Sequence, residues 1–257
     1  MRDKTLIITG STGIGAAAAR LAGKQGARLV VATNDEISGW ELAAETSGEC
    51  WVGDLTRPEA AASVLGLCLS KFGRVDALFN VAGLSGRRFG DGPVHEVTSE
   101  GWEVTLTHNL TVTFRFCQAA ISRMMEQAVP EHGVRGAIVN MGSVLADAPE
   151  PRHFATHAYA AAKGAIAAMS RSMAAYYAPH KIRVNVVAPG LIRTPTSERA
   201  QGTTELQEFI RKKQALAGGM VDAEDVARAA LFLLSEEARC ITGEILTVDA
   251  GWSVTGV

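Results

Sequence analysis

The sequence predicts an α/β fold, a single doubly wound domain in which helices cover both faces of a parallel seven-stranded sheet. Short β-branched runs alternate with helical patterns along all 257 residues, which is typical of strand–helix–strand units with right-handed crossovers. Most of these runs are apolar throughout, as strands buried on both faces are. No linker, repeat or low-complexity segment interrupts the pattern, so we expect residues 1–257 to form one domain.

The elements follow from the runs in chain order. Strands are expected at about Thr5–Ile8, Arg28–Ala32, Cys50–Val52, Ala77–Asn80, Ala137–Asn140, Arg183–Val187 and Ile245–Val248. Helices are expected at Gly15–Gln25, Glu36–Glu45, Glu59–Phe72, Thr98–Gln127, Ala158–Ala178 and Asp222–Leu234. Thr56 and Glu59 have the hydroxyl and carboxylate of a capping box around Pro58. Asp222 with Asp225 is a weaker version of the same signal.

The composition is that of an ordinary globular protein. Hydrophobic residues make up 47% of the 27.1 kDa chain, charged residues 20%, and the formal net charge is -2, so nothing favours a nucleic-acid or membrane partner. The four cysteines form no C-x-x-C pair, which argues against zinc or disulfides and fits a reducing compartment. The apolar run Thr5–Ile8 is too short for a signal sequence or a membrane span. We therefore expect a cytoplasmic protein.

The first expected strand ends in a glycine-rich turn that opens an alanine-rich helix. The turn consists of Gly10, Ser11, Thr12, Gly13, Ile14 and Gly15. In a strand–turn–helix unit, such glycines let backbone N–H groups and the helix N-terminus approach a pyrophosphate. A tight turn without a ligand has the same local chemistry, but the position at the first strand of an alternating chain favours nucleotide binding.

A tyrosine and a lysine stand four residues apart in a helix-forming run, at Tyr159 and Lys163. Positions i and i+4 share one face of an α-helix. A cation that favours the phenolate by about 4 kcal/mol would lower the pKa of a phenol by about 3 units, which suits general acid/base chemistry near neutrality. Taken alone, such a pair is more often an ordinary helix face, so its meaning depends on the rest of the chain.

Further motifs follow the glycine turn in order. They are Asp54-Leu55 after the third strand, Asn80-Val81-Ala82-Gly83 after the fourth, Asn109 in the long helix, Ser143 after the fifth strand, Tyr159 with Lys163, Pro189-Gly190 with Thr194 after the sixth, and Ile241-Thr242-Gly243 with Val248-Asp249-Ala250-Gly251 near the end. Each motif is modest alone. Together, over nearly the full length, the chain resembles the short-chain dehydrogenase/reductase family in its compact single-domain, Rossmann-like form.

This resemblance implies an NAD(P)-dependent oxidoreductase that interconverts an alcohol and a ketone or aldehyde by hydride transfer. Tyr159 would be the general acid/base, and Lys163 would lower its pKa and bond the nicotinamide ribose. Ser143 would donate a hydrogen bond to the substrate oxygen, while Asn109 would hold a water that links Lys163 to solvent. The implied cofactor contacts, besides Tyr159 and Lys163, are Gly10, Ser11, Thr12, Gly13, Ile14, Gly15, Thr33, Asn34, Asp54, Leu55, Asn80, Ala82, Gly83, Pro189, Gly190, Ile192 and Thr194.

Two departures from the family pattern are visible. The glycine turn has only Ser11 and Thr12 between its first two glycines, one residue fewer than the usual turn, so contacts to the adenosine ribose and phosphate are expected to differ. The gap from Ser143 to Tyr159 is about three residues longer than the common spacing. The extra length falls in residues 147–153, where two prolines argue against a helix, and we expect it to reshape one wall of the substrate pocket.

The choice between NAD and NADP rests on the end of the second strand. An acidic residue there normally accepts the adenosine ribose hydroxyls, but Thr33 holds that place. Thr12 and Asn34 stand where NADP users often carry basic residues, and Asp35 adds negative charge. We favour NAD and leave NADP open, because a Thr/Asn pair can still bond a phosphate.

The substrate is only weakly constrained. The segment at about 194–217 is polar with a short amphipathic patch, and we expect it to be a substrate lid. His153 and His157 have i,i+4 spacing without an acidic third ligand, so no metal site is expected. Basic residues in the loops expected near the site would favour an anionic substrate, unless they are solvated loop charges, which is the commoner case. They are Arg87, Arg88, Arg152, His153 and Arg193.

The resemblance allows three functions and implies an oligomeric state. The leading function is an alcohol dehydrogenase or carbonyl reductase. A 3-oxoacyl-[acyl-carrier-protein] reductase using NADPH has the same skeleton, and a nucleotide-sensing protein without turnover is the third possibility. The presence of all four catalytic groups favours an enzyme. Relatives are commonly tetramers or dimers, so a homo-oligomer is expected.

Overall fold

Parallel strands form the central sheet of the computed structural model, which describes residues 1–129, 133–194, 197 and 204–256. The strands are β1 (Thr5–Thr9), β2 (Arg28–Thr33), β3 (Glu49–Val52), β4 (Ala77–Asn80), β5 (Gly136–Met141), β6 (Ile182–Pro189) and β9 (Ile245–Val248). Among the described residues they make one seven-stranded sheet in the order β3-β2-β1-β4-β5-β6-β9, and every neighbouring pair is parallel. The predicted fold class is therefore confirmed.

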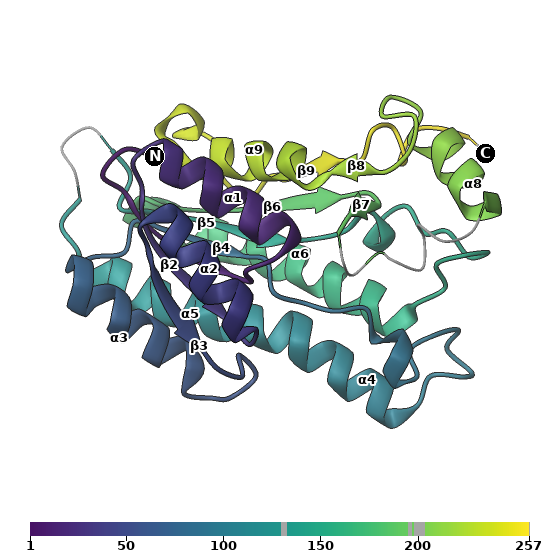
Figure 1. Ribbon diagram of the computed structural model, residues 1–257, viewed down its shortest axis with the longest axis horizontal. Helices are drawn as coiled ribbons and strands as arrows, with labels where there is room; N and C mark the ends of the chain where they lie inside the picture. Colours follow the sequence, from purple (N-terminus) through teal and green to yellow (C-terminus); the bar gives the residue numbers. More distant parts are fainter. Residues whose placement is uncertain (130–132, 195–196, 198–203, 257) are drawn as a thin grey trace.

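Helices cover both faces of this sheet. They are α1 (Gly13–Lys24), α2 (Glu36–Thr46), α3 (Ala60–Phe72), α4 (Ser99–Leu106), α5 (Val112–Glu126), α6 (His157–Tyr177), α8 (Thr204–Lys213) and α9 (Ala223–Leu234). Figure 1 shows α1 and α9 along one face and α3 and α5 along the other. Side chains of successive strand residues point to opposite faces of the sheet. Ile8 packs in the core between the sheet and α1 and α9, and Ile7 packs in the core between the sheet and α3 and α5.

The predicted long helix at 98–127 is interrupted. A π-helical segment, Thr107–Thr111, separates α4 from α5. Within it, the Asn109 amide donates to the carbonyl oxygens of Thr105 and Leu84, each at 2.9 Å. A side chain that bonds the preceding turn in this way competes with the regular helical ladder, which accounts for the irregular turn at a candidate catalytic residue.

Both expected capping interactions are wrong. The α3 helix begins at Ala60, and Glu59 at its N-cap makes no side-chain cap bond. Thr56 instead donates its hydroxyl to the carboxylate of Asp54 at 2.7 Å. Asp222 makes no cap bond to α9 and pairs with Arg193 at 3.2 Å. The side chains expected to cap the helices therefore bond charged residues instead, Thr56 with Asp54 and Asp222 with Arg193.

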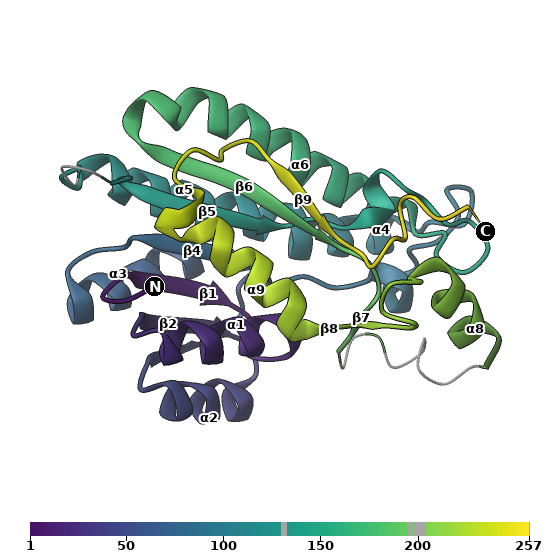
Figure 2. The same ribbon diagram turned by 90° about the horizontal axis from the view of Figure 1, so that it is seen from above.

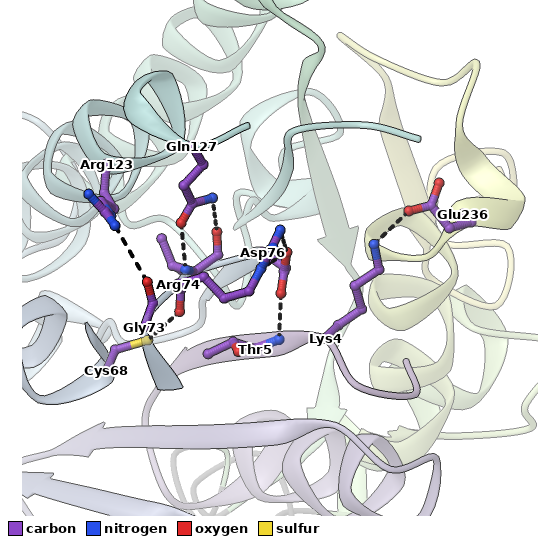
Figure 3. A network of polar contacts seen from close by, with 10 residues as sticks. Lys4, Thr5, Cys68, Gly73, Arg74, Asp76, Arg123, Gln127 and Glu236 are labelled. Carbon is purple, nitrogen blue, oxygen red and sulfur yellow. Dashed lines mark hydrogen bonds and ion pairs between the residues drawn. The ribbon is translucent and has the colours of Figure 1, made fainter. Parts of the chain in front are cut away.

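The amino ends of β1 and β4 are joined by a polar network at one edge of the sheet (Figure 3). The Asp76 carboxylate accepts the backbone N–H of Thr5 at 2.9 Å and pairs with Arg74. The Gln127 amide bonds both the N–H and the carbonyl of Val75, each at 2.8 Å. We assign this network a structural role, because it lies at the amino ends of the strands. The glycine turn and the other candidate residues follow the carboxyl ends, on the opposite side of the sheet.

A smaller unit lies beyond the carboxyl edge, where Figure 2 shows α8 with β7 (Ile192–Arg193) and β8 (Val221–Asp222). The expected lid at about 194–217 falls in this unit, and its residues 195–196 and 198–203 lie outside the described residues. The described part contains α8, which buries Leu206 and Ile210. Among the described residues, no helix has the length and apolar character needed to cross a bilayer.

Candidate active site

The glycine turn lies at the carboxyl end of β1, which runs between β2 and β4. From β1, the strands β2 and β3 are added on one side and β4, β5 and β6 on the other, so the strand order reverses here. Ligands of doubly wound proteins bind at such a switch point. A Cβ on Gly15 would lie 2.3 Å from the carbonyl oxygen of Gly10, so the turn closes too tightly for any side chain there. Gly10 and Gly13 have φ of 102° and 50°, in the left-handed region that favours glycine. The short turn therefore still forms a close strand-to-helix junction.

The N-terminus of α1 is open toward a ligand. Thr12 occupies the N-cap position without a side-chain cap bond, and Gly13 and Ile14 open the helix. Backbone N–H groups and the positive end of the helix dipole there suit an anion such as a pyrophosphate. A Cβ on Gly13 would lie 2.9 Å from the Thr194 methyl group, which places Thr194 directly against the turn.

Thr9 joins the first strand to the loop after β4. Its hydroxyl oxygen accepts the backbone N–H groups of Val81 and Ala82, at 2.9 and 3.0 Å. Sequence reasoning missed this residue, because its partners are more than 70 residues away and no local pattern reveals them. Asn80, at the end of β4, is buried, and its side-chain amide donates to Asn140 at 2.8 Å.

A cluster of hydroxyl groups lies at the end of β2. The Ser11 hydroxyl is 2.8 Å from that of Thr33 and 2.6 Å from that of Ser38. The exposed Asp35 carboxylate accepts the backbone N–H of Ser38 at 3.2 Å, which caps α2, and bonds to Ser38 hold the pKa of Asp35 below its ordinary value. Asn34 is exposed beside it. The cluster is thus polar with one negative charge.

The loop after β3 presents a second carboxylate. Asp54 is exposed at the carboxyl edge, and hydrogen bonds from Thr56 hold the pKa of its carboxyl below the ordinary value. Leu55 is buried in the core on the α3 and α5 side. Asp54 is therefore charged at neutral pH and accessible from solvent, as a contact to an adenine would require.

Tyr159, Lys163 and Ser143 lie close together. The Lys163 ammonium lies 5.4 Å from the centre of the Tyr159 ring, on one face of α6. It donates a hydrogen bond to the carbonyl oxygen of Met141 at the end of β5. Ser143 follows Met141 by two residues, and its hydroxyl lies close enough to the Tyr159 phenol to lower the pKa of that phenol. A hydroxyl, a phenol and an ammonium thus meet at the carboxyl edge of the sheet.

Burial controls the charge of this group. It raises the pKa of Tyr159 above its ordinary value, and the nearby Ser143 hydroxyl partly offsets the rise. It lowers the pKa of Lys163 to about 7. The direction for Tyr159 is opposite to the one expected from the sequence, because the burial that disfavours the phenolate also leaves the lysine only partly charged near neutral pH.

Asn109 is fully buried beside the same group. Its Oδ1 atom has no hydrogen-bond partner, although the side chain is 0% exposed. A Cβ on Gly83 would lie 2.5 Å from this oxygen and 3.6 Å from the Lys163 Nζ atom. A side chain at position 83 would therefore crowd both groups, and an orphaned buried acceptor here fits a bound water or ligand hydroxyl.

The loop after β6 is held by a glutamine that the sequence did not single out. Pro189 ends β6, and a Cβ on Gly190 would lie 2.3 Å from the Gln214 side-chain oxygen. Gln214 is buried and bonds both the N–H and the carbonyl of Leu191, at 2.6 and 3.0 Å. Ile192 is buried in β7. The bonds from Gln214 therefore hold the loop that places Thr194 against the glycine turn.

The longer segment between Ser143 and α6 packs against the smaller unit. Trp252, 1% exposed, stacks edge-on with Phe154 at 5.7 Å and with Phe209 at 5.8 Å. Its indole N–H donates to the Ala148 carbonyl. The Trp252 ring is therefore used for packing within the chain.

Neither metal nor disulfide chemistry is indicated by the described residues. Within the described part of the chain, no three His, Cys, Asp or Glu side chains are grouped to hold a metal ion. All four cysteines are free, and Cys240 is the exposed one.

The fold and the site define a dinucleotide-binding oxidoreductase, and comparisons with known proteins agree. A family model described as enoyl-(acyl carrier protein) reductase matches residues 8–253. The chain is 33% identical to glucose 1-dehydrogenase 2 of Bacillus subtilis, over 99% of this chain and 96% of that one. It is 36% identical to a Xanthobacter autotrophicus protein named inactive 2-(S)-hydroxypropyl-CoM dehydrogenase 2, over 91% and 98% of the two chains.

A solved structure is also similar. The 3-ketoacyl-(acyl-carrier-protein) reductase from Brucella melitensis complexed with NADH superposes with a TM-score of 0.86 at 27% identity, over 98% of this chain and 99% of that one. The chain belongs to the short-chain dehydrogenase/reductase family. It is an NAD(P)-dependent oxidoreductase of the class that acts on alcohol and carbonyl groups, as the resemblance implied.

Proposed function

We propose that the chain interconverts a small neutral alcohol and its ketone or aldehyde, with Tyr159 as the general acid/base. The observation that carries this proposal is the meeting of Tyr159, Ser143 and Lys163 beside the unpartnered oxygen of Asn109. The bound nicotinamide supplies or accepts the hydride. Every other step falls to side chains of this chain.

In the direction of reduction, the substrate oxygen would accept a hydrogen bond from Ser143 and a proton from Tyr159. Lys163, with a pKa of about 7, would stabilise the phenolate left behind when it is protonated. The Asn109 oxygen, buried and without a partner, would hold the water through which the proton is replaced. Oxidation reverses the order of these transfers.

We propose NAD as the preferred cofactor. The glycine turn, the open N-terminus of α1 and the hydroxyl cluster of Ser11, Thr33 and Ser38 fit the phosphates and adenosine ribose. Asp35 is the charged residue in that cluster, and its carboxylate would repel a 2′-phosphate. NADP stays the alternative, because the hydroxyl groups offer donors to a phosphate as well.

The proposed substrate is neutral because three of the four arginines in the nearby loops bond other groups of the protein. Arg152 pairs with Glu205 at 2.8 Å and Arg193 with Asp222 at 3.2 Å. Arg87 donates to the carbonyl oxygen of His153 at 2.8 Å. These bonds weaken the case for an anionic substrate. The family description and the Brucella relative keep a 3-oxoacyl-carrier reductase as the alternative.

The test is a titration of the purified protein with NADH and with NADPH, followed by nicotinamide fluorescence. Neutral sugars, polyols and secondary alcohols are then assayed with NAD, and a 3-oxoacyl thioester with NADPH. Tighter NADH binding with turnover of a neutral alcohol supports the proposal. Tighter NADPH binding with thioester reduction favours the alternative, and binding without any turnover favours a nucleotide sensor.

We also propose that the enzyme is a homo-oligomer, a dimer or tetramer. Large apolar side chains are exposed on several helices, namely Trp102 on α4, Phe114 on α5, Tyr176 on α6 and Phe232 on α9. Exposed aromatic side chains of this size favour contact with another protein surface. Light scattering after size-exclusion chromatography measures the mass directly, and a mass near 27.1 kDa would contradict the proposal.

A cytoplasmic location completes the proposal. The free cysteines, three buried and one exposed, support a reducing compartment. Fractionation of the source cells with an antibody against the protein tests the location.

A further inference from the structure

The first turn of α6, which carries Tyr159, is capped from a distant loop. The two oxygens of the Asp91 carboxylate accept the backbone N–H groups of Ala158 at 2.9 Å and of Tyr159 at 3.0 Å. The carbonyl oxygen of Gly92 accepts the N–H of His157 at 3.1 Å. Three consecutive N–H groups at the helix start are therefore bonded by two adjacent residues that lie more than 60 positions earlier.

The helix does not cap itself. Thr156 holds the N-cap position, but it makes no side-chain cap bond and its hydroxyl donates to the Phe154 carbonyl instead. The first N–H groups of a helix have no partner within the helix, and a carboxylate bonds them strongly. Asp91 supplies that carboxylate, and it is only 5% exposed. Water is therefore a poor substitute if the carboxylate is removed.

The loop around Asp91 is itself held firmly. The Asp91 N–H donates to the Gly86 carbonyl oxygen at 3.1 Å. Gly90 has φ of 98°, and its carbonyl oxygen accepts the N–H of Thr98. A Cβ on Gly101, in α4, would lie 2.7 Å from the Asp91 nitrogen, so the loop packs directly on that helix.

These contacts connect two catalytic elements. The α4 helix leads into the π-helical segment with Asn109, and α6 carries Tyr159. Asp91 stands between them, bonded to the backbone of Tyr159 itself. The first turn of a helix frays easily, and Tyr159 lies in the first turn of α6. Because the phenol of Tyr159 moves with its backbone, fraying of this turn would displace the phenol.

We propose that Asp91 is a positioning residue that holds Tyr159 in register with Ser143 and Asn109. The proposal rests on the proposed catalytic role of Tyr159. Because misplacement of a catalytic group by about 1 Å can cost 10²-fold in rate, loss of the carboxylate should lower kcat far more than it lowers cofactor affinity.

The test compares Asp91→Asn and Asp91→Ala with the wild-type enzyme, using the alcohol that the wild type oxidises fastest with NAD. We expect kcat to fall about 10- to 100-fold in D91A and less in D91N, since the amide keeps one acceptor oxygen. NADH affinity, measured by fluorescence, should change less than about twofold, because Asp91 bonds none of the residues of the glycine turn. D91N keeps the shape of the side chain, so it serves if D91A does not fold.

Asp76→Asn is the matched control. Asp76 is as buried as Asp91, at 7% against 5%, and its carboxylate also accepts a backbone N–H, but at the opposite edge of the sheet. We expect D76N to lower Tm as D91N does while leaving kcat unchanged. A D91N kcat equal to that of the wild type, or a D76N loss as large as the D91N loss, would overturn the positioning role. Absence of turnover in the wild-type enzyme would overturn the proposed function, and the positioning role with it.

Discussion

The ammonium of Lys163 donates a hydrogen bond to the Met141 carbonyl oxygen at 3.0 Å while the residue is 3% exposed. Among the described residues no carboxylate pairs with it, and burial lowers its pKa to about 7, against 10.5 for the free side chain. This lysine is therefore held at a pKa that suits proton exchange, and the fold bears the cost of keeping it buried.

That cost predicts a pH-dependent stability. Between about pH 7 and 10.5 the unfolded chain binds the Lys163 proton and the folded chain does not, so the free energy of unfolding should rise with pH through this window. Relative to Lys163→Met, the wild type should gain about 2 kcal/mol between pH 7 and 9. Urea denaturation of both proteins at each pH measures the difference. A difference that stays constant with pH would show that Lys163 keeps an ordinary pKa.

Tyr159→Phe should lower kcat by orders of magnitude and spare cofactor binding. The substitution removes only the phenol oxygen, which lies near the Ser143 hydroxyl and would exchange the proton with the substrate. General acid/base catalysis contributes about 10²- to 10⁴-fold, and we expect kcat to fall by that amount. Initial rates give kcat and a fluorescence titration gives NADH affinity. Turnover as fast as that of the wild type would exclude Tyr159 as the proton donor.

Ser143→Ala should lower kcat by about 10²-fold, because a donor to the developing oxyanion is lost. The matched control is Ser170→Ala, which removes another buried hydroxyl, one that lies on α6 itself and accepts a hydrogen bond from the Asn140 amide at 2.9 Å. S170A is expected to lower Tm without changing kcat. Equal losses of kcat in the two variants would mean that the Ser143 hydroxyl acts through packing alone.

Local signals account for what could be predicted from the sequence. The strands were expected within about two residues of their bounds, because their apolar runs are long and the glycine turns end them sharply. The i,i+4 spacing predicted that Tyr159 and Lys163 share one helix face, whereas the place of Ser143 beside them was implied by the family resemblance. The break between α4 and α5 could not be predicted, since it depends on a side chain bonding a carbonyl in another loop.

The supporting residues were beyond sequence reasoning for the same reason. Thr9, Asp91 and Gln214 each bond backbone groups that lie far along the chain, and a side-chain-to-backbone contact leaves no pattern in the sequence of its partner. The Gly90-Asp91-Gly92-Pro93 stretch resembles an ordinary turn. The chemistry of the site could thus be predicted, whereas the residues that hold it in place required the three-dimensional arrangement.

Asp35→Asn should relax the cofactor preference. Asparagine caps a helix about as well as aspartate, so α2 keeps its bond to the Ser38 N–H while the negative charge beside the Ser11 and Thr33 hydroxyls is lost. We expect NADPH affinity to rise about fivefold at low ionic strength and NADH affinity to change little, since only NADPH carries a 2′-phosphate near this charge. Added salt should shrink the difference between wild type and variant, because the carboxylate is exposed. Fluorescence titrations of both proteins with both cofactors, at low and high salt, measure all of these changes. If the two cofactors gain equally, Asp35 does not face the 2′ position, and the proposed preference for NAD would have to rest on other residues.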